Sequence, residues 1–190
     1  MPEKGITKIL IPEQEIQTIV KSLGREITRH YRKNGGELLV VGLLKGSFVF
    51  MADLIRSIEY PLMVDFLAVS SYTDATVSSG EVTIKMDIGE SIQGKSILLV
   101  EDIVDTGYTF QKVIRLLEKR QPASLKTCAF LSKPSRREVD VPIDFFGRDI
   151  PDEFVCGYGL DYAQKYRNLP YIGVLGAVGS GKPLRVATHE

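Results

Sequence analysis

The chain has 190 residues, of which 44% are hydrophobic and 25% are charged, and this mixture is ordinary for one soluble globular domain. Its 24 basic and 24 acidic residues cancel, so no global positive field favours nucleic acid or an anionic membrane surface. No segment approaches the ~18 consecutive apolar residues of a membrane-spanning helix, and the N-terminus has no signal-peptide core, so we expect a cytoplasmic protein.

The first predicted elements are a helix, a strand and a second helix. Apolar residues recur at helical spacing over residues 16–31, and NGG at 34–36 ends that pattern. Residues 38–44 form a continuous apolar run, typical of a parallel strand covered on both faces. The polar turn at 45–47 and a helical pattern through Ile58 follow, which is the unit from which α/β domains are built.

The next two predicted strands lie on either side of a polar loop. Residues 61–69 read as a strand, and apolar residues alternate with polar ones over 82–88, so the two strands could pair antiparallel. Between them, SSYTDATVSSGE at 70–81 is rich in Ser and Thr and has no apolar periodicity. It is either a closing loop over a site or merely a solvated connection.

The stretch ILLVEDIVDTGYT at 97–109 has charge where a buried strand would avoid it. An apolar strand at 97–100 precedes a helical pattern at 110–117, so Glu101 and Asp102 fall just where the strand leaves the core, and residues 105–109 form the turn into the helix. Ligands of parallel sheets bind beyond the carboxyl ends of the strands, so we expect these carboxylates to line the mouth of a site and not a core. The alternative is a solvated strand end followed by ordinary helix caps at Asp105 and Thr106.

Residues 106–109, after the acids, have the properties of a phosphate cradle. They stand at the expected N-terminus of a helix, where unpaired amides and a partial positive charge attract anions. Neighbouring acids would repel a phosphate. The conflict disappears if the ligand also carries a sugar whose hydroxyls are accepted by Glu101 and Asp102, or if magnesium bridges the charges.

The remaining patterns complete an α/β domain with a mainly parallel sheet flanked by helices. A further strand covers 125–131, and a polar, aromatic region runs from 145 to 171. We expect one domain at 1–175 and a flexible C-terminal extension at 176–190, whose GAVGSGKP imitates a nucleotide-binding phosphate loop but ends in Pro183. Cys128 and Cys156 lie in apolar surroundings, and we expect buried thiols.

VEDIVDTGYT at 100–109 resembles the phosphoribosyl-diphosphate-binding signature of the type I phosphoribosyltransferases. From about Ile9 to Val174 the chain resembles the hypoxanthine-guanine branch of that family. Further motifs occur in the same order as in the family. LLKGS at 43–47 is similar to its pyrophosphate loop, and SSY at 70–72 is similar to the start of its closing loop. LSKPS at 131–135 is similar to its base-selecting lysine strand, and IPDEFVCGYGLDY at 150–162, with Arg167 after it, is similar to its purine and metal site.

The resemblance implies the family's fold, with a small hood region and a flexible closing loop, and its purine salvage reaction. In that reaction the phosphoribosyl group moves from phosphoribosyl diphosphate to N9 of hypoxanthine or guanine, giving IMP or GMP and pyrophosphate. The resemblance also implies that the enzyme uses Mg2+ and forms a dimer or tetramer. The implied residues are Glu101, Asp102, Asp105, Thr106, Gly107, Tyr108 and Thr109 for the phosphoribosyl group, Lys45, Gly46 and Arg167 for pyrophosphate, Lys133, Phe154, Val155 and Asp161 for the purine, Ser71 and Tyr72 in the closing loop, and Glu101, Asp102 and Asp161 for the metal.

Several of these implied roles have a physical basis. Lys133 can donate to the C6 carbonyl of a 6-oxopurine, Phe154 can stack on its face, and Asp161 can hold magnesium against a diphosphate. Asp105 is the expected general base, which removes the N7 proton as N9 attacks the ribose. Taken singly, Lys133, Phe154 and Asp161 would be a surface lysine, a core aromatic and a turn cap.

The sequence departs from the family's pattern at two positions, and two other functions are alternatives to the transferase. Tyr108 and Glu153 stand where some members of the family carry lysine, so both positions lack positive charge near the ligand. One rival is a regulator that keeps the phosphoribosyl pocket but binds nucleic acid, which would require a basic face or an extra domain. The other is a phosphohydrolase with an aspartate nucleophile, which would leave Lys133, Phe154 and Asp161 unexplained together.

Overall fold

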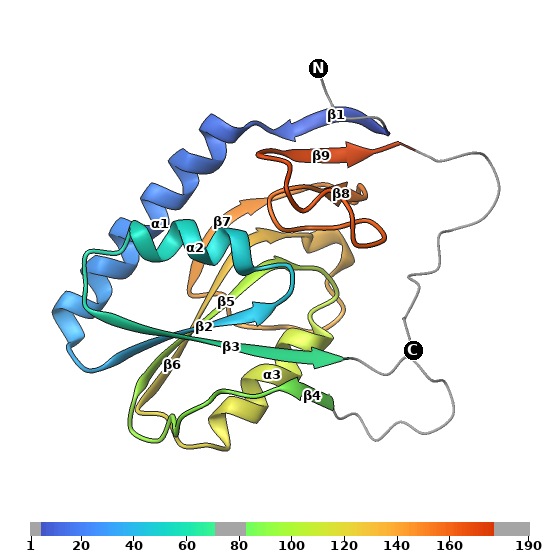
Figure 1. Ribbon diagram of the computed structural model, residues 1–190. Coiled ribbons are helices and arrows are strands. Elements are labelled where there is room, and N and C mark those ends of the chain that lie inside the picture. The colour runs from blue at the N-terminus through green and yellow to red at the C-terminus, as the bar shows by residue number, and fades with distance from the viewer. Residues whose placement is uncertain (1–4, 71–82, 177–190) are drawn as a thin grey trace.

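The computed structural model describes residues 5–70 and 83–176, and its centre is a six-stranded sheet (Figure 1). The strand order is β4 (Thr83–Met86), β3 (Leu62–Ser70), β2 (Leu38–Leu44), β5 (Ser96–Val104), β6 (Ser124–Ser132) and β7 (Phe145–Asp149). All neighbours are parallel except β3 and β4, which are antiparallel as expected. The expected closing loop, with Ser71 and Tyr72, and the extension after Gly176 lie outside the described residues.

Helices α1 (Glu13–Asn34) and α2 (Phe48–Arg56) cover one face of this sheet, and α3 (Tyr108–Glu118) covers the other (Figure 1). Strand β2 shows why its sequence is apolar throughout. Its side chains alternate, so that Val40 packs with α1 and α2 whereas Leu39 packs with α3. The prediction of a strand covered on both faces is therefore confirmed.

A second, three-stranded antiparallel sheet lies at the carboxyl end of the parallel strands, and we call it the hood sheet (Figure 1). It consists of β1 (Ile6–Ile11), β9 (Ile172–Leu175) and β8 (Val155–Cys156), in that order. Strand β1 pairs with β9, so the two ends of the described chain meet in this sheet. The short 3-10 helix η1 (Pro134–Arg136) follows β6 and leads towards the same edge of the main sheet.

Strand β5 is longer than expected. It continues to Val104 instead of ending at Val100, because β6 supplies backbone partners beyond the last residue that pairs with β2. Glu101 and Asp102 therefore lie inside the strand and not at its end.

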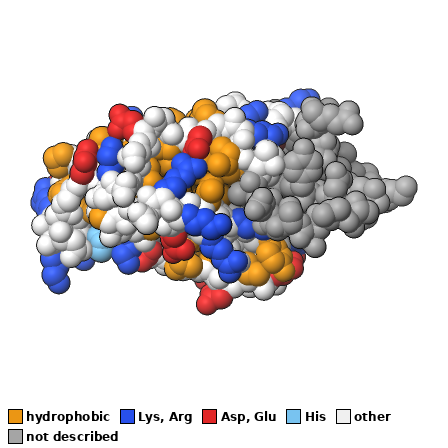
Figure 2. Space-filling view, turned by 90° about the horizontal axis from the view of Figure 1, so that it is seen from below, with side chains coloured by type: hydrophobic (Ala, Val, Ile, Leu, Met, Phe, Trp, Pro, Cys, Tyr) orange, Lys and Arg blue, Asp and Glu red, His pale blue; other side chains and the backbone are white. Residues whose placement is uncertain are grey.

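The surface charges, the hydropathy of the helices and the state of the two cysteines complete the description of the fold. On the face seen in Figure 2, acidic and basic side chains are interspersed with hydrophobic ones. In the part of the chain that the structure describes, no helix is both long enough and apolar enough to cross a membrane. Cys128 and Cys156 are buried and free, as expected.

Candidate active site

The end of β5, the turn after it and the first turn of α3 enclose a cavity of about 220 Å³. Its lining consists of Glu101, Ile103, Val104, Asp105, Thr106, Gly107, Thr109 and Phe110. Most of the residues expected to bind a phosphoribosyl group therefore line one hollow. A larger hollow of about 330 Å³ lies at the amino ends of β2 and β3, next to Tyr60 and Pro61, and contains none of the expected site residues.

The N-terminus of α3 faces this cavity without a side-chain cap. The helix begins at Tyr108, whose side chain is exposed, and its N-cap is Gly107, with a φ of 94°. The alternative in which Asp105 and Thr106 cap the helix is therefore wrong, because no side chain bonds to this helix end. Its amides remain available to an anion, as the cradle requires.

The turn before α3 is braced by the segment after η1. The amides of Glu138 and Val139 donate to the carbonyl of Thr106 over 3.0 and 3.2 Å. A Cβ on Gly107 would stand 2.8 Å from the carbonyl oxygen of Val139, so the chain approaches too closely for any larger residue. The shape of the cradle thus depends on a segment some thirty residues away in the sequence.

Asp102 is buried, which corrects the expectation that it lines an open mouth, whereas Glu101 is half-buried and lines the cavity. Oxygen Oε2 of Glu101 has neither solvent nor a hydrogen-bond partner, and Asp102 is 6% exposed. Burial raises the pKa of Glu101 well above its usual value, and the neighbouring charge of Asp102 adds to the shift. Burial also raises the pKa of Asp102. Such a pair favours a ligand that brings hydroxyl donors or a cation.

The two acids face different parts of the site. Glu101 lines the cavity beside α3, whereas Asp102 touches Gly46 in the turn between β2 and α2. On its other side, the carbonyl of Gly46 packs against the α-carbon of Gly159, in the loop after β8. Lys45, beside Gly46, has an exposed side chain. Three chain segments thus meet where the resemblance places pyrophosphate.

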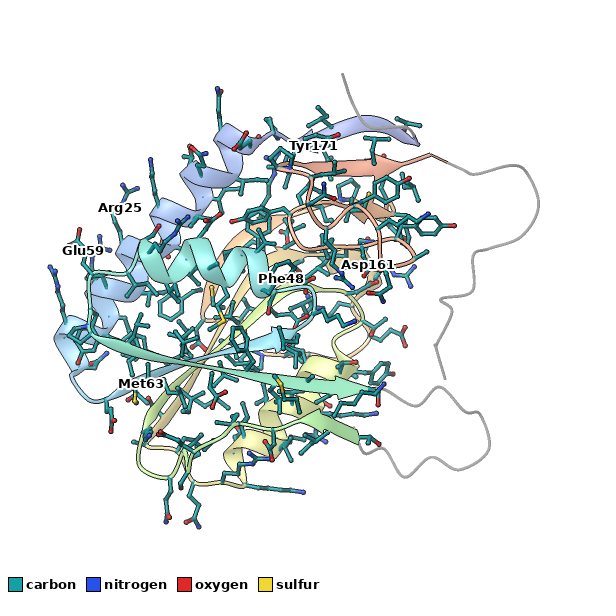
Figure 3. All side chains as sticks on the ribbon, in the orientation of Figure 1. Arg25, Phe48, Glu59, Met63, Asp161 and Tyr171 are labelled. Atoms are coloured by element: carbon teal, nitrogen blue, oxygen red, sulfur yellow. The ribbon has the colours of Figure 1, made fainter. Side chains whose placement is uncertain are left out.

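Arg167 and Asp161 form an ion pair in the loop after β8. Arg167 Nη2 lies 2.6 Å from Asp161 Oδ1, and Arg167 Nη1 donates to the carbonyl of Gly159 over 2.7 Å. Figure 3 shows Asp161 beneath the hood sheet, on the same side of the molecule as Phe48 at the start of α2. The charge of Arg167 also acts to lower the pKa of Asp102, against the effect of burial.

The expected magnesium ligands are not assembled into one group. Among the residues that the structure describes, no three His, Cys, Asp or Glu side chains are placed to hold a metal ion together. Glu101 and Asp102 are neighbours in β5, while Asp161 is paired with Arg167. The carboxylates still suit Mg2+, because this ion commonly takes only one or two carboxylates and completes its shell with water and phosphate oxygens.

Lys133 lies at the end of β6 and is buried, with 7% of its surface exposed. Its amide donates to the carbonyl of Val104 over 3.0 Å, which holds the residue beside the cavity, and its Nζ lies 3.9 Å from Asp152 Oδ1. The ordinary expectation of a surface lysine does not apply here. Phe154 is 47% exposed and its ring is nearly perpendicular to that of Tyr162, while the adjacent Val155 is buried.

Asp105 is bonded to two arginines that the motifs did not single out. Arg136 Nε donates to Asp105 Oδ1 over 2.8 Å, and Arg137 Nε donates to the carbonyl of Asp105 over 3.1 Å. The one sequence signal for this contact is the pair of basic residues directly after LSKPS.

Comparisons with known proteins agree with this geometry. The family model described as phosphoribosyl transferase domain matches residues 10–163. Hypoxanthine phosphoribosyltransferase of Salmonella typhimurium is 52% identical over 170 residues, which is 90% of this chain and 96% of that protein. Hypoxanthine-guanine phosphoribosyltransferase of Bacillus subtilis is 50% identical over 175 residues, with 92% and 96% covered. A crystal structure of hypoxanthine phosphoribosyltransferase from Staphylococcus aureus is similar with a TM-score of 0.86 and 48% identity, over 90% of this chain and 92% of that one.

Proposed function

The chain belongs to the hypoxanthine-guanine branch of the phosphoribosyl transferase family, which serves purine salvage, and we propose which parts of its site hold each substrate. The reaction joins hypoxanthine or guanine to the ribose of phosphoribosyl diphosphate and releases pyrophosphate. The observation that carries the assignment is the cavity of about 220 Å³ at the end of β5, where a helix N-terminus and the carboxylates of Glu101 and Asp105 lie beside the buried Lys133.

The phosphoribosyl group occupies the cavity. The amides at 106–109 and the hydroxyls of Thr106 and Thr109 bind the 5′-phosphate, supported by the uncapped N-terminus of α3. Glu101 and Asp102 accept hydrogen bonds from the ribose hydroxyls, which satisfies carboxylates that burial otherwise destabilises. As the bond to the anomeric carbon loosens, the same carboxylates stabilise the positive charge that develops on the ribose.

The diphosphate lies where the turn at Gly46 meets the loop after β8. Lys45, the backbone of Gly46 and Arg167 bind its oxygens, and Arg167 is already oriented by its bond to Gly159. Asp161, or the Glu101 and Asp102 carboxylates, would hold Mg2+, which would supply positive charge to neutralise the departing diphosphate. The unpartnered Oε2 of Glu101 supports a cation or a hydrogen-bond donor in the neighbouring cavity beside α3.

The purine lies between Lys133 and Phe154. Nζ of Lys133 donates to the C6 carbonyl, a bond that adenine cannot accept because it carries an amino group there. The exposed ring of Phe154 stacks on the base, beside Val155. Asp105 accepts the N7 proton as N9 forms the bond to the anomeric carbon, so the proton moves from the base to the carboxylate.

Pyrophosphate release tests this proposal. The purified protein is incubated with phosphoribosyl diphosphate, Mg2+ and one base at a time: hypoxanthine, guanine, xanthine or adenine. We expect release with hypoxanthine or guanine, little with adenine, and none after chelation of Mg2+. Release of inorganic phosphate without any base would instead indicate a phosphohydrolase, and the proposal would fail.

The proposal extends to assembly and location. We propose a homodimer or tetramer, for which exposed apolar side chains such as Phe48 and Val64 offer contact surface, and sedimentation of the pure protein tests it. We also propose a cytoplasmic location, which the free, buried thiols of Cys128 and Cys156 support.

A further inference from the structure

Two consecutive arginines donate hydrogen bonds to Asp105, one to its side chain and one to its backbone. Arg136 bonds to the carboxylate, and Arg137 bonds to the backbone carbonyl, at 2.8 and 3.1 Å. Both arginines belong to the segment after β6, which also supplies Lys133. Asp105, directly after β5, is thus held by the segment that also supplies the proposed purine ligand Lys133.

Arg137 donates to two backbone carbonyls directly before the phosphate cradle and to one side chain of β6. Its Nη2 donates to the carbonyl of Val104 over 3.2 Å and to Ser132 Oγ over 2.8 Å. Its Cδ would lie 3.2 Å from a Cβ on Gly107. A planar guanidinium can reach these acceptors together, whereas the single ammonium of a lysine cannot. Arg137 therefore holds the chain where β5 ends and the cradle begins.

Arg136 instead connects two acidic side chains next to the proposed purine site, Asp105 and Asp152. Besides Asp105, its Nη1 lies 3.5 Å from Asp152 Oδ1, the same oxygen that lies 3.9 Å from Nζ of Lys133. Charges of opposite sign alternate along Lys133, Asp152, Arg136 and Asp105. Among the described residues, Arg136 is the one side chain bonded to the Asp105 carboxylate, and it occupies Oδ1, which leaves Oδ2 for a proton from the purine.

We propose that Arg136 and Arg137 are positioning residues with separate tasks: Arg137 shapes the cradle for the 5′-phosphate, and Arg136 aims the Asp105 carboxylate at the purine. The inference rests on the proposed function, in which Asp105 accepts the N7 proton and the amides at 106–109 bind phosphate. The two tasks separate because one arginine holds the backbone and the other holds the carboxylate.

Steady-state kinetics of four variants test the separation. Arg136→Gln lowers kcat about tenfold or more while KM for phosphoribosyl diphosphate stays within about twofold, and Arg136→Lys recovers much of kcat because a point charge still orients the carboxylate. Arg137→Gln raises KM for phosphoribosyl diphosphate about tenfold with a smaller change in kcat, and Arg137→Lys does not recover it. Arg120→Gln is the control, because it breaks an ion pair with Asp87 at 2.7 Å outside the site.

Several results would overturn the inference. It fails if both glutamine variants change kcat and KM by the same factor, or if neither differs from the Arg120→Gln control. If Arg137→Gln does not fold, Arg137→Lys keeps the charge and the stem, and a wild-type KM in that variant contradicts the task given to Arg137. Activity of the unaltered protein with hypoxanthine is measured alongside: its absence would refute the proposed function itself, whereas activity without the kcat and KM split refutes this inference alone.

Discussion

The α-carbon of Gly46 packs directly against the carboxylate of Asp102. A methyl group on Gly46 would overlap that carboxylate, and one on Gly159 would overlap the carbonyl of Gly46. Because both positions are glycine, the turn after β2, the end of β5 and the loop after β8 can pack together with no room for a Cβ atom between them. This contact places a buried acid beside the turn to which we assign the leaving pyrophosphate.

Gly46→Ala therefore displaces either Asp102 or the turn. We expect KM for phosphoribosyl diphosphate to rise about tenfold or more, and the free energy of unfolding to fall by about 1–3 kcal/mol, the usual cost of overpacking. Kinetics and denaturant unfolding measure the two effects. Gly89→Ala is the matched control, because a Cβ there would meet its nearest neighbour, Asp65 Oδ2, at an ordinary 3.7 Å. Equal effects of the two substitutions would contradict the packing argument.

Asp105→Asn removes the proposed proton acceptor and retains its size. We expect kcat to fall by about 10²–10⁴-fold, the usual contribution of a positioned base, with binding of phosphoribosyl diphosphate within a few-fold. Rapid-quench measurement of nucleotide formation separates the chemical step from product release. Near-normal turnover would remove Asp105 from this role.

Lys133→Ala tests the choice of base. Without Nζ, the C6 carbonyl of a bound 6-oxopurine lacks a partner, which costs about 1–3 kcal/mol, or roughly ten- to a hundred-fold in apparent affinity. Adenine carries no such penalty, so the ratio of 6-oxopurine to adenine use should fall, as competition between the bases in one assay would show. An equal loss for both bases would assign Lys133 to structure.

The raised pKa of Glu101, whose Oε2 is buried, makes the stability of the metal-free protein depend on pH. Its pKa is higher in the folded state, so the folded state binds the proton more tightly than the unfolded chain does. Stability from this group is complete below the unfolded pKa of about 4.3 and is lost as the pH rises through the folded pKa. Glu101→Gln should therefore reduce the fall in Tm as the pH rises above about 5, measured by calorimetry with EDTA. An unchanged profile would show that Glu101 does not titrate in this way.

Local patterns in the sequence predicted most of the main sheet and its helices. Strand β2 was expected at 38–44 and is found at Leu38–Leu44, and the helix expected to end at the NGG of 34–36 ends at Asn34. Apolar periodicity, glycine and short motifs report on neighbours within one element, so they suffice for these elements. The motif at 100–109 likewise identified the residues that line the cavity, because one strand-to-helix turn supplies them.

Contacts between distant segments were decided only by the tertiary structure. The hood sheet was not predicted, because β8 has two residues and Ile11 finds its partner in Ile172, at the other end of the described chain. The burial of Glu101 Oε2 and of Lys133, and the hydrogen bonds of two arginines to Asp105, depend equally on segments that meet in space. A residue's type and local spacing indicate what it can bind, but its burial and its partners are set by chain segments that the local pattern does not contain.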